Sequence, residues 1–294
     1  MIVMIRILLF LSLSVYVCSC KSPNSYLSRS NSNIAQFKVA SYNIRYDAVA
    51  DQKTGNAWAL RKEPLSDLIK RHRFDLLGTQ EGSVTQMQEL LELLPGFAKV
   101  DVGYGGKDGN LHTCAVLYKT VHFELLDSGV FWLSETPDVP SIGWDATDRR
   151  ICQWTKMKDK KSGKSFYFFN AHFYWRNEIA RRESGPLMVR KIQEIAGTNP
   201  VLIVGDFNSE PNSSQVLTMK TVFADSYEVS VNGTKGKVGT AFPGGVFQGE
   251  PGGRIDYIFV NKTTAVSDYE VYSDVYGDNR YPSDHLPISC WIRF

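Results

Sequence analysis

The sequence has few cysteines, almost no net charge and no apolar run long enough to span a bilayer. Beyond Cys18 and Cys20, only three cysteines remain, Cys114, Cys152 and Cys290. Three thiols cannot all pair with one another, and buried cysteine packs as a small hydrophobic residue, so the sequence assigns no disulfide bond. The formal net charge is +2. General nucleic-acid binders are usually much more basic, so the composition gives no support for tight binding to a polyanion.

The N-terminal segment predicts export. Arg6 is the only charged residue among residues 1–19, and it precedes an apolar run over residues 7–17. A run of this length is too short to span a bilayer comfortably and is typical of a signal-peptide core. It ends in Val-Cys-Ser-Cys at residues 17–20, which resembles the cleavage box of bacterial lipoproteins, with Cys20 as the lipidated residue. An ordinary secretory signal cut nearby is the alternative.

These features divide the chain into three parts. We expect a lipoprotein signal peptide over residues 1–19, a flexible tether over residues 20–35 and one folded domain over residues 36–294. The tether is rich in Ser and Asn, as flexible linkers are. The expected location is the bacterial cell envelope, at the outer membrane or its periplasmic side. We expect a monomer held at the membrane through a lipid on Cys20.

Apolar periodicity predicts more strands than helices. Strands are expected over residues 37–44, 75–81, 113–118, 121–131, 151–158, 166–172, 201–206, 254–260, 266–272 and 286–294. Helical spacing predicts helices over residues 58–71, 84–94 and 178–196. Because the helices are few and follow strands, two packed sheets flanked by helices are the simplest architecture.

Polar residues recur where the apolar strands end. Carboxylates, amides and histidines at strand ends suit a hard divalent metal and the activation of water. Any one of them alone is adequately explained as a turn or cap residue. The chain, however, has eight: Asn43, Glu81, His172, Asp206, Asn208, Asp256, Asp284 and His285. Taken together they predict a metal-dependent phosphoester hydrolase.

Six short motifs resemble the endonuclease/exonuclease/phosphatase superfamily, which includes deoxyribonuclease-like enzymes. They are Ser-Tyr-Asn at 41–43, Thr-Gln-Glu at 79–81, Asn-Ala-His at 170–172, Gly-Asp-Phe-Asn at 205–208, Arg-Ile-Asp-Tyr-Ile at 254–258 and Ser-Asp-His at 283–285. Residues 131–137 and 143–145 further resemble a secreted bacterial subgroup. The resemblance implies a four-layer α/β (α+β) sandwich, in which two mainly antiparallel β-sheets pack face to face and are flanked by helices.

The resemblance also implies a metal site. Glu81 would be the main ligand of Mg²⁺ or Mn²⁺, Asn43 would assist it, and Asp284 would lie near the ion. This set is chemically reasonable, because Mg²⁺ takes few protein oxygens and keeps room for water and for the phosphate of the substrate.

Five further residues receive catalytic roles from the resemblance. Asp206 would position or deprotonate the attacking water, and Asn208 would donate to the phosphoryl oxygens as charge develops. His285, oriented by Asp256, would act as a general acid or base or as a phosphate ligand. His172 would contact the phosphate.

Two pairs of residues are candidates for binding the substrate. Arg181 and Arg182, on the helix predicted over residues 178–196, would neutralise phosphate charge, and a solvated helix face is the alternative. Tyr174 and Trp175 would line a substrate face, for example against a sugar or a base, and packing under the next helix is the alternative.

The chain departs from the family pattern around His172. Ala171 and Tyr174 stand where secreted relatives commonly have Thr and Asp, and His112 stands where relatives often have a Glu. In some relatives that Glu orients the histidine that matches His172. We therefore expect His172 to lack its orienting carboxylate, and its replacement by alanine to cost less activity than that of His285.

Two classes of function remain open. The leading hypothesis is a phosphodiesterase or phosphatase, whose substrate is a nucleic acid, a phosphoinositide, sphingomyelin or a sugar phosphate; the near-zero net charge does not favour a nucleic acid. The second is a non-catalytic surface lipoprotein that binds a glycan or another polymer with the same fold. Tyr174 and His112 favour the second hypothesis, whereas the presence of both Asp206 and His285 argues against it.

The anchor prediction can be tested directly. Replacing Cys20 by alanine should stop lipid attachment and move the protein out of the membrane fraction, because stable anchoring needs more than one acyl chain and the lipidated cysteine carries them. Membrane fractionation and labelling with a clickable fatty acid are the measurements. Unchanged fractionation and unchanged labelling would contradict the lipoprotein hypothesis.

Overall fold

The structure is a computed structural model that describes residues 34–106 and 112–294. The predicted signal peptide, all but the last two residues of the predicted tether, and Cys20 lie outside the described residues. Among the residues it describes, no helix is long and apolar enough to cross a membrane.

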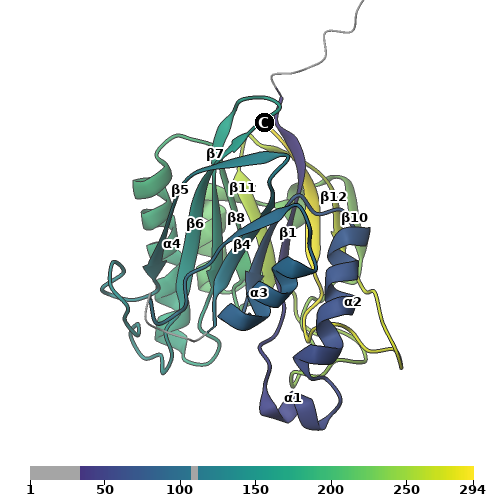
Figure 1. Ribbon diagram of the computed structural model, residues 1–294. Helices are drawn as coiled ribbons and strands as arrows, with labels where there is room; N and C mark the ends of the chain where they lie inside the picture. Colours follow the sequence, from purple (N-terminus) through teal and green to yellow (C-terminus); the bar gives the residue numbers. More distant parts are fainter. Residues whose placement is uncertain (1–33, 107–111) are drawn as a thin grey trace, which may run out of the picture. The chain divides into compact units, whose positions relative to one another are not determined.

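The described residues form two β-sheets and the helices that flank them (Figure 1). In chain order the elements are β1 (Gln36–Asn43), α1 (Val49–Lys53), α2 (Trp58–Arg71), β2 (Leu76–Gln80), α3 (Val84–Glu92), β3 (Phe97–Val100), β4 (Cys114–Lys119), β5 (Phe123–Trp132), β6 (Ile151–Asp159), β7 (Ser165–His172), α4 (Glu178–Ala196), β8 (Val201–Asp206), α5 (Ser214–Val222), β9 (Phe223–Asp225), α6 (Ser226–Val229), β10 (Val231–Gly236), β11 (Asp256–Asn261), β12 (Ala265–Val271) and β13 (Ile288–Arg293).

The two sheets are mainly antiparallel. The seven-stranded sheet has the order β10-β12-β13-β1-β2-β4-β3, and the six-stranded sheet has the order β5-β6-β7-β8-β11-β9. The parallel pairs are β1 with β2, β10 with β12, and β7 with β8. The predicted fold class, two mainly antiparallel sheets flanked by helices, is confirmed.

The apolar alternation along the strands fills the space between the sheets. Phe37 of β1 packs against Phe123 of β5 and Phe166 of β7, with ring centroids 4.9 and 5.1 Å apart. On the outer faces, α2 and α3 cover the seven-stranded sheet and α4 covers the six-stranded sheet (Figure 1). Each sheet therefore buries both faces, which gives the four layers expected from the resemblance.

One polar side chain crosses the apolar layer between the sheets. The Nδ2 of Asn170, on β7, donates to the backbone carbonyls of Thr79 and Ala115 in the opposite sheet, at 2.9 and 2.8 Å. Gln80 donates to Asn170 Oδ1 at 2.6 Å. A Cβ on Gly78 would lie 2.7 Å from Asn170 Cγ. The lack of a side chain at Gly78 therefore lets the amide reach its partners.

The elements that the periodicity did not predict are short or weakly patterned. They are α1, α5, α6, β3, β9 and β10. The strand β10 is exposed along its whole length, so it has no apolar alternation to recognise. The helices α2 and α4, by contrast, have the predicted boundaries, because their apolar faces are buried against a sheet.

A buried arginine ties together the loops that follow β1 and precede β13. The Arg61 side chain, on α2, is fully buried and donates to the backbone carbonyls of Ile44, Arg45, Tyr46, Asn56 and Pro282. These five hydrogen bonds satisfy backbone carbonyls that lie in loops and have no partner in a sheet. Burial lowers the pKa of the Arg61 guanidinium, and the five acceptors together offset the loss of its hydration.

Replacing Arg61 by methionine should destabilise the fold, because the carbonyls of these loops would stay buried without donors. We expect the free energy of unfolding to fall by about 3 kcal/mol. The measurement is denaturant unfolding, with R190M as the matched control, since Arg190 is exposed on α4 and its side chain bonds only Glu194 among the described residues. Equal stability of the two variants would contradict this role of Arg61.

Candidate active site

A cavity of about 910 Å³ lies where the strands of both sheets end. The carboxyl ends of parallel neighbours meet at one edge of a sheet, so β1 and β2 deliver Asn43 and Glu81 together, and β7 and β8 deliver His172 and Asp206. The antiparallel register places Asp256 directly opposite Asp206. The predicted site residues on the cavity wall are Glu81, His172, Asp206, Asn208, Asp284, His285 and Trp175.

Asn43 and Asp256 do not line the cavity, but they bond side chains that do. The Nδ2 of Asn43 donates to Glu81 Oε1 at 3.1 Å and to Asp206 Oδ2 at 3.0 Å, while its Oδ1 accepts from the backbone N–H of Arg45 at 3.0 Å. One amide thus connects the carboxylates of two different sheets. Asp256 does not face the cavity either and contacts His285.

His285 lies between two carboxylates. Its Nδ1 is 2.9 Å from Asp256 Oδ2, and its Nε2 is 3.7 Å from Asp206 Oδ2. Burial acts to lower the pKa of His285, but the charges of Asp256 and Asp206 outweigh burial and raise this pKa well above its ordinary value. Burial raises the pKa of Asp256 to about 6. The predicted His285–Asp256 pair is therefore present and can hold a proton at His285.

Asp206 remains an anion in the same surroundings. Burial acts to raise its pKa, but His285, His172 and the backbone N–H of Asn208 outweigh burial and lower the pKa below its ordinary value. The backbone N–H of Asn208 donates to Asp206 Oδ1 at 2.8 Å. An ionised, buried carboxylate at a cavity wall can accept a proton from a water molecule or orient it.

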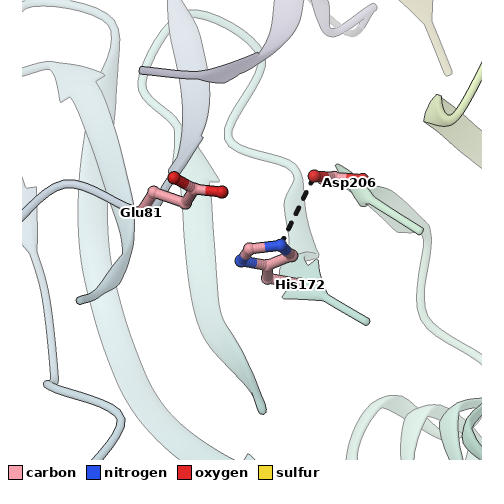
Figure 2. A group of neighbouring side chains, drawn as sticks. All are labelled: Glu81, His172 and Asp206. Atoms are coloured by element: carbon pink, nitrogen blue, oxygen red, sulfur yellow. Dashed lines mark ion pairs between the residues drawn. The ribbon is translucent and has the colours of Figure 1, made fainter. Parts of the chain in front are cut away.

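Among the described residues, His172 has no carboxylate at Nδ1, as the sequence led us to expect, but its ring does have orienting partners. Its Nδ1 lies 2.6 Å from the hydroxyl of Tyr104, and its Nε2 lies 3.4 Å from Asp206 Oδ2 and 3.1 Å from Asn208 Nδ2 (Figure 2 shows the contact with Asp206). Arg150 adds a contact to Nδ1 at 3.1 Å. Tyr104 thus contacts the Nδ1 side of the ring and can orient it without a carboxylate.

The electrostatics favour a neutral His172. Burial lowers its pKa, and the charge of Arg150 lowers it further. His112, which stands where relatives often have a Glu, stacks on Tyr46, with ring centroids 4.5 Å apart.

The acidic groups on the wall suit a hard divalent cation. Glu81, His172 and Asp206 can each offer a ligand atom, and these atoms lie within 4.8 Å of one another (Figure 2). Burial acts to raise the pKa of Glu81, but the positive charges around it lower the pKa below its ordinary value. Within residues 34–106 and 112–294, no cationic nitrogen lies within 4.0 Å of a Glu81 oxygen. The Glu81 carboxylate is therefore an anionic ligand whose hydrogen-bond partners are neutral, and such a ligand fits Mg²⁺ or Mn²⁺.

Asp284 completes the acidic side of the cavity. Its Oδ2 lies 3.2 Å from Arg45, whose Nε also bonds Asp51 at 3.0 Å. Of the three predicted metal-site residues, Glu81 and Asp284 line the cavity, and Asn43 donates to Glu81 without lining it.

The predicted substrate-binding residues are only partly at the cavity. Trp175 lines it, is 49% exposed and stacks under Arg176, whose Cζ is 4.2 Å from the ring centroid. Tyr174 is buried, and its hydroxyl contacts Thr147 at 3.0 Å.

Arg181 and Arg182 do not line the cavity. Arg182 pairs with its neighbour Glu183, and the prediction that they would meet the phosphate does not match this placement.

The arginines that do line the cavity are Arg45, Arg149 and Arg150. Arg149 and Arg150 directly precede the apolar strand β6. The rule that selected the other site residues, polar groups at the ends of apolar strands, could also have selected this pair. Tyr104, in a loop, carries no comparable signal.

Comparison with known proteins gives consistent relatives. The family described as the Endonuclease/Exonuclease/phosphatase family matches residues 40–285. A crystal structure of a family protein from Bacteroides thetaiotaomicron is 36% identical, with a TM-score of 0.84, and the match covers 89% of this chain and 98% of that chain. A mannosyl-6-phosphatase of the same organism is also 36% identical, with a TM-score of 0.82, covering 88% of this chain and 100% of that chain.

A more distant relative is viral. An uncharacterized protein of Acanthamoeba polyphaga mimivirus is 28% identical over 251 residues, which are 79% of this chain and 90% of the viral protein.

Because His172 has partners on both ring nitrogens, H172A and H285A should lower kcat by similar factors, each about 10²–10⁴-fold. Y104F should lower kcat less, by about 10-fold, since Asp206 and Asn208 still contact Nε2. The measurement is kcat on one phosphoester substrate, with thermal unfolding as the folding control. A much smaller loss for H172A than for H285A would restore the expectation drawn from the sequence.

Proposed function

The chain belongs to the endonuclease/exonuclease/phosphatase family, and we propose that it is a metal-dependent hydrolase that attacks a phosphoester with an activated water molecule. The observation that carries the proposal is the convergence of Glu81, Asp206 and His285 from both sheets on one cavity. A metal ligand, an ionised carboxylate and a histidine that holds a proton are the groups that such a reaction needs.

The described geometry supports a division of labour among the wall residues. Asp206, kept ionised by its neighbours, positions the attacking water and takes its proton. His285, which shares a proton with Asp256, donates to the leaving or non-bridging oxygen. Asn208 and the neutral His172 lie beside Asp206 and donate to the phosphoryl oxygens as negative charge develops.

The metal side of the cavity has its own residues. Glu81 would hold Mg²⁺ or Mn²⁺, with Asn43 and Asp284 next to it. Bound there, the ion would supply Lewis-acid stabilisation of the phosphoryl charge.

The cavity supports a small phosphorylated molecule as the substrate. Its volume, about 910 Å³, is in the range of small-molecule sites. Of the described residues that line it, none is lysine and three are arginine, of which Arg45 is paired with Asp51 and Asp284; two remaining cations suit one phosphate group better than an extended nucleic-acid backbone. Trp175 offers an exposed ring, and Asp148 and Glu210 on the wall offer acceptors for hydroxyl groups. Together with the similarity to a mannosyl-6-phosphatase, this favours a sugar phosphate.

Binding without catalysis is the weaker alternative. Tyr174 and His112 were the residues that favoured it. Tyr174 is buried behind the cavity wall, against Thr147 and Arg150, and His172 contacts Tyr104. Neither departure removes a catalytic group, so the arrangement favours an enzyme.

We further propose that the protein is exported, monomeric and anchored to the cell envelope through Cys20. The support is the apolar run over residues 7–17 and the Val-Cys-Ser-Cys box at residues 17–20.

Metal dependence can be tested at Glu81. We expect EDTA to abolish hydrolysis and Mg²⁺ or Mn²⁺ to restore it. E81Q should lower the rate at saturating metal by about 100-fold or more, because an amide is a poorer ligand than a carboxylate. Titration of activity with metal and calorimetric metal binding are the measurements, and E194Q on exposed α4 is the control. Full activity of E81Q with unchanged metal affinity would remove Glu81 from the site.

A further inference from the structure

Two adjacent arginines on the cavity wall have no acidic partner among the described residues. Arg149 and Arg150 directly precede β6 and line the cavity. In the part of the chain that the structure describes, no carboxylate oxygen lies within 4.0 Å of either guanidinium group. Arg45, in the same cavity, is by contrast held by Asp51 and Asp284.

The guanidinium groups also have hydrogen-bonding capacity to spare. A guanidinium has five N–H donors. The described contacts of Arg150 use only one terminal nitrogen, which faces His172 at 3.1 Å. The buried Nε atoms of Arg149 and Arg150 have no hydrogen-bond partner among the described residues. Two positive groups with unused donors at a cavity wall are suited to an anion.

The position of Arg150 is fixed by aromatic rings. Its Cζ lies 5.8 Å from the ring centroid of Tyr104 and 5.8 Å from that of Tyr174. Cation–π contacts of this kind hold a guanidinium in place and leave its edge available. The contact with His172, which in turn lies 3.4 Å from Asp206, places this edge beside the residues that we assign to the phosphoryl group.

We propose that Arg149 and Arg150 form a subsite for a doubly charged phosphate, and that this subsite makes the protein select phosphate monoesters over phosphodiesters. The inference rests on the proposed function and names the class of bond that the site prefers. A monoester carries a charge of about −1.5 to −2 at pH 7, whereas a diester carries a single charge and has one fewer free oxygen. Only the monoester matches two guanidinium groups in both charge and acceptor number.

The experiment compares two substrates with the same leaving group, p-nitrophenyl phosphate and bis-p-nitrophenyl phosphate, on the protein and its variants. R149Q and R150Q should each lower kcat/KM for the monoester by about 10- to 100-fold, the usual effect of losing a charge-assisted contact. The loss for the diester should be at least several-fold smaller, and R149K should recover part of the monoester rate. R190Q, on the exposed face of α4, is the matched control.

The same variants are tested for binding of inorganic phosphate by calorimetry, which does not depend on turnover. R149Q and R150Q should weaken phosphate binding by a similar 10- to 100-fold, and R190Q should leave it unchanged. Equal losses on both esters, a wild-type preference for the diester, or unchanged phosphate binding would overturn the subsite. If the wild type hydrolyses neither ester, the proposed function fails, and the phosphate measurement still decides whether the two arginines bind the anion.

Discussion

The side-chain amide of Asn43 connects the site residues of one sheet with those of the other. Glu81 follows a strand of the seven-stranded sheet and Asp206 ends a strand of the six-stranded sheet, yet one Nδ2 donates to both carboxylates. Two acids that face each other repel, and a shared donor offsets part of that repulsion. The site therefore depends on how the sheets are aligned. Asn170 also fixes this alignment, because its amide bonds backbone carbonyls of the opposite sheet within the apolar layer. Gly78 leaves the space that the Asn170 amide needs.

The turns that follow the site strands carry backbone strain. Arg45, Glu81 and Asn208 have φ values of 57°, 67° and 46°, in the left-handed region that residues other than glycine rarely adopt. Each lies one or two residues beyond the end of a strand, at β1, β2 and β8. Such conformations persist only where the surroundings enforce them. The five bonds of Arg61 to loop carbonyls are one source of that enforcement, because they hold the segment after β1 while Arg45 turns toward the cavity.

Much of this site could be predicted from sequence because its parts lie at strand ends. An apolar run that stops at a polar residue marks a strand tip, and parallel neighbours bring such tips together, as for Asn43 with Glu81 and for His172 with Asp206. Tyr104 could not be found in this way, since it comes from a loop and reaches His172 only through tertiary packing. The sequence could not decide between the two interpretations of Arg181 and Arg182, because helical spacing says which residues share a face but not which face meets the cavity. The two-sheet fold was predictable because its long strands have a clear apolar pattern. The short elements, such as β9 and α6, have too few residues to show such a pattern.

The cavity wall carries charges of both signs that the described residues do not pair with one another. Glu81 is an ionised carboxylate whose described hydrogen-bond partners are neutral groups. Arg149 and Arg150, on the same cavity wall, are cations whose described contacts include no carboxylate. His285 and Asp206 carry opposite charges, and their closest atoms lie 3.7 Å apart. Glu81, Arg149 and Arg150 are partly exposed, so each can receive a partner of opposite sign. A divalent cation bound to a phosphate monoester would supply both partners at once, so the residues proposed to bind the metal and those proposed to select the substrate are best understood as one electrostatic unit.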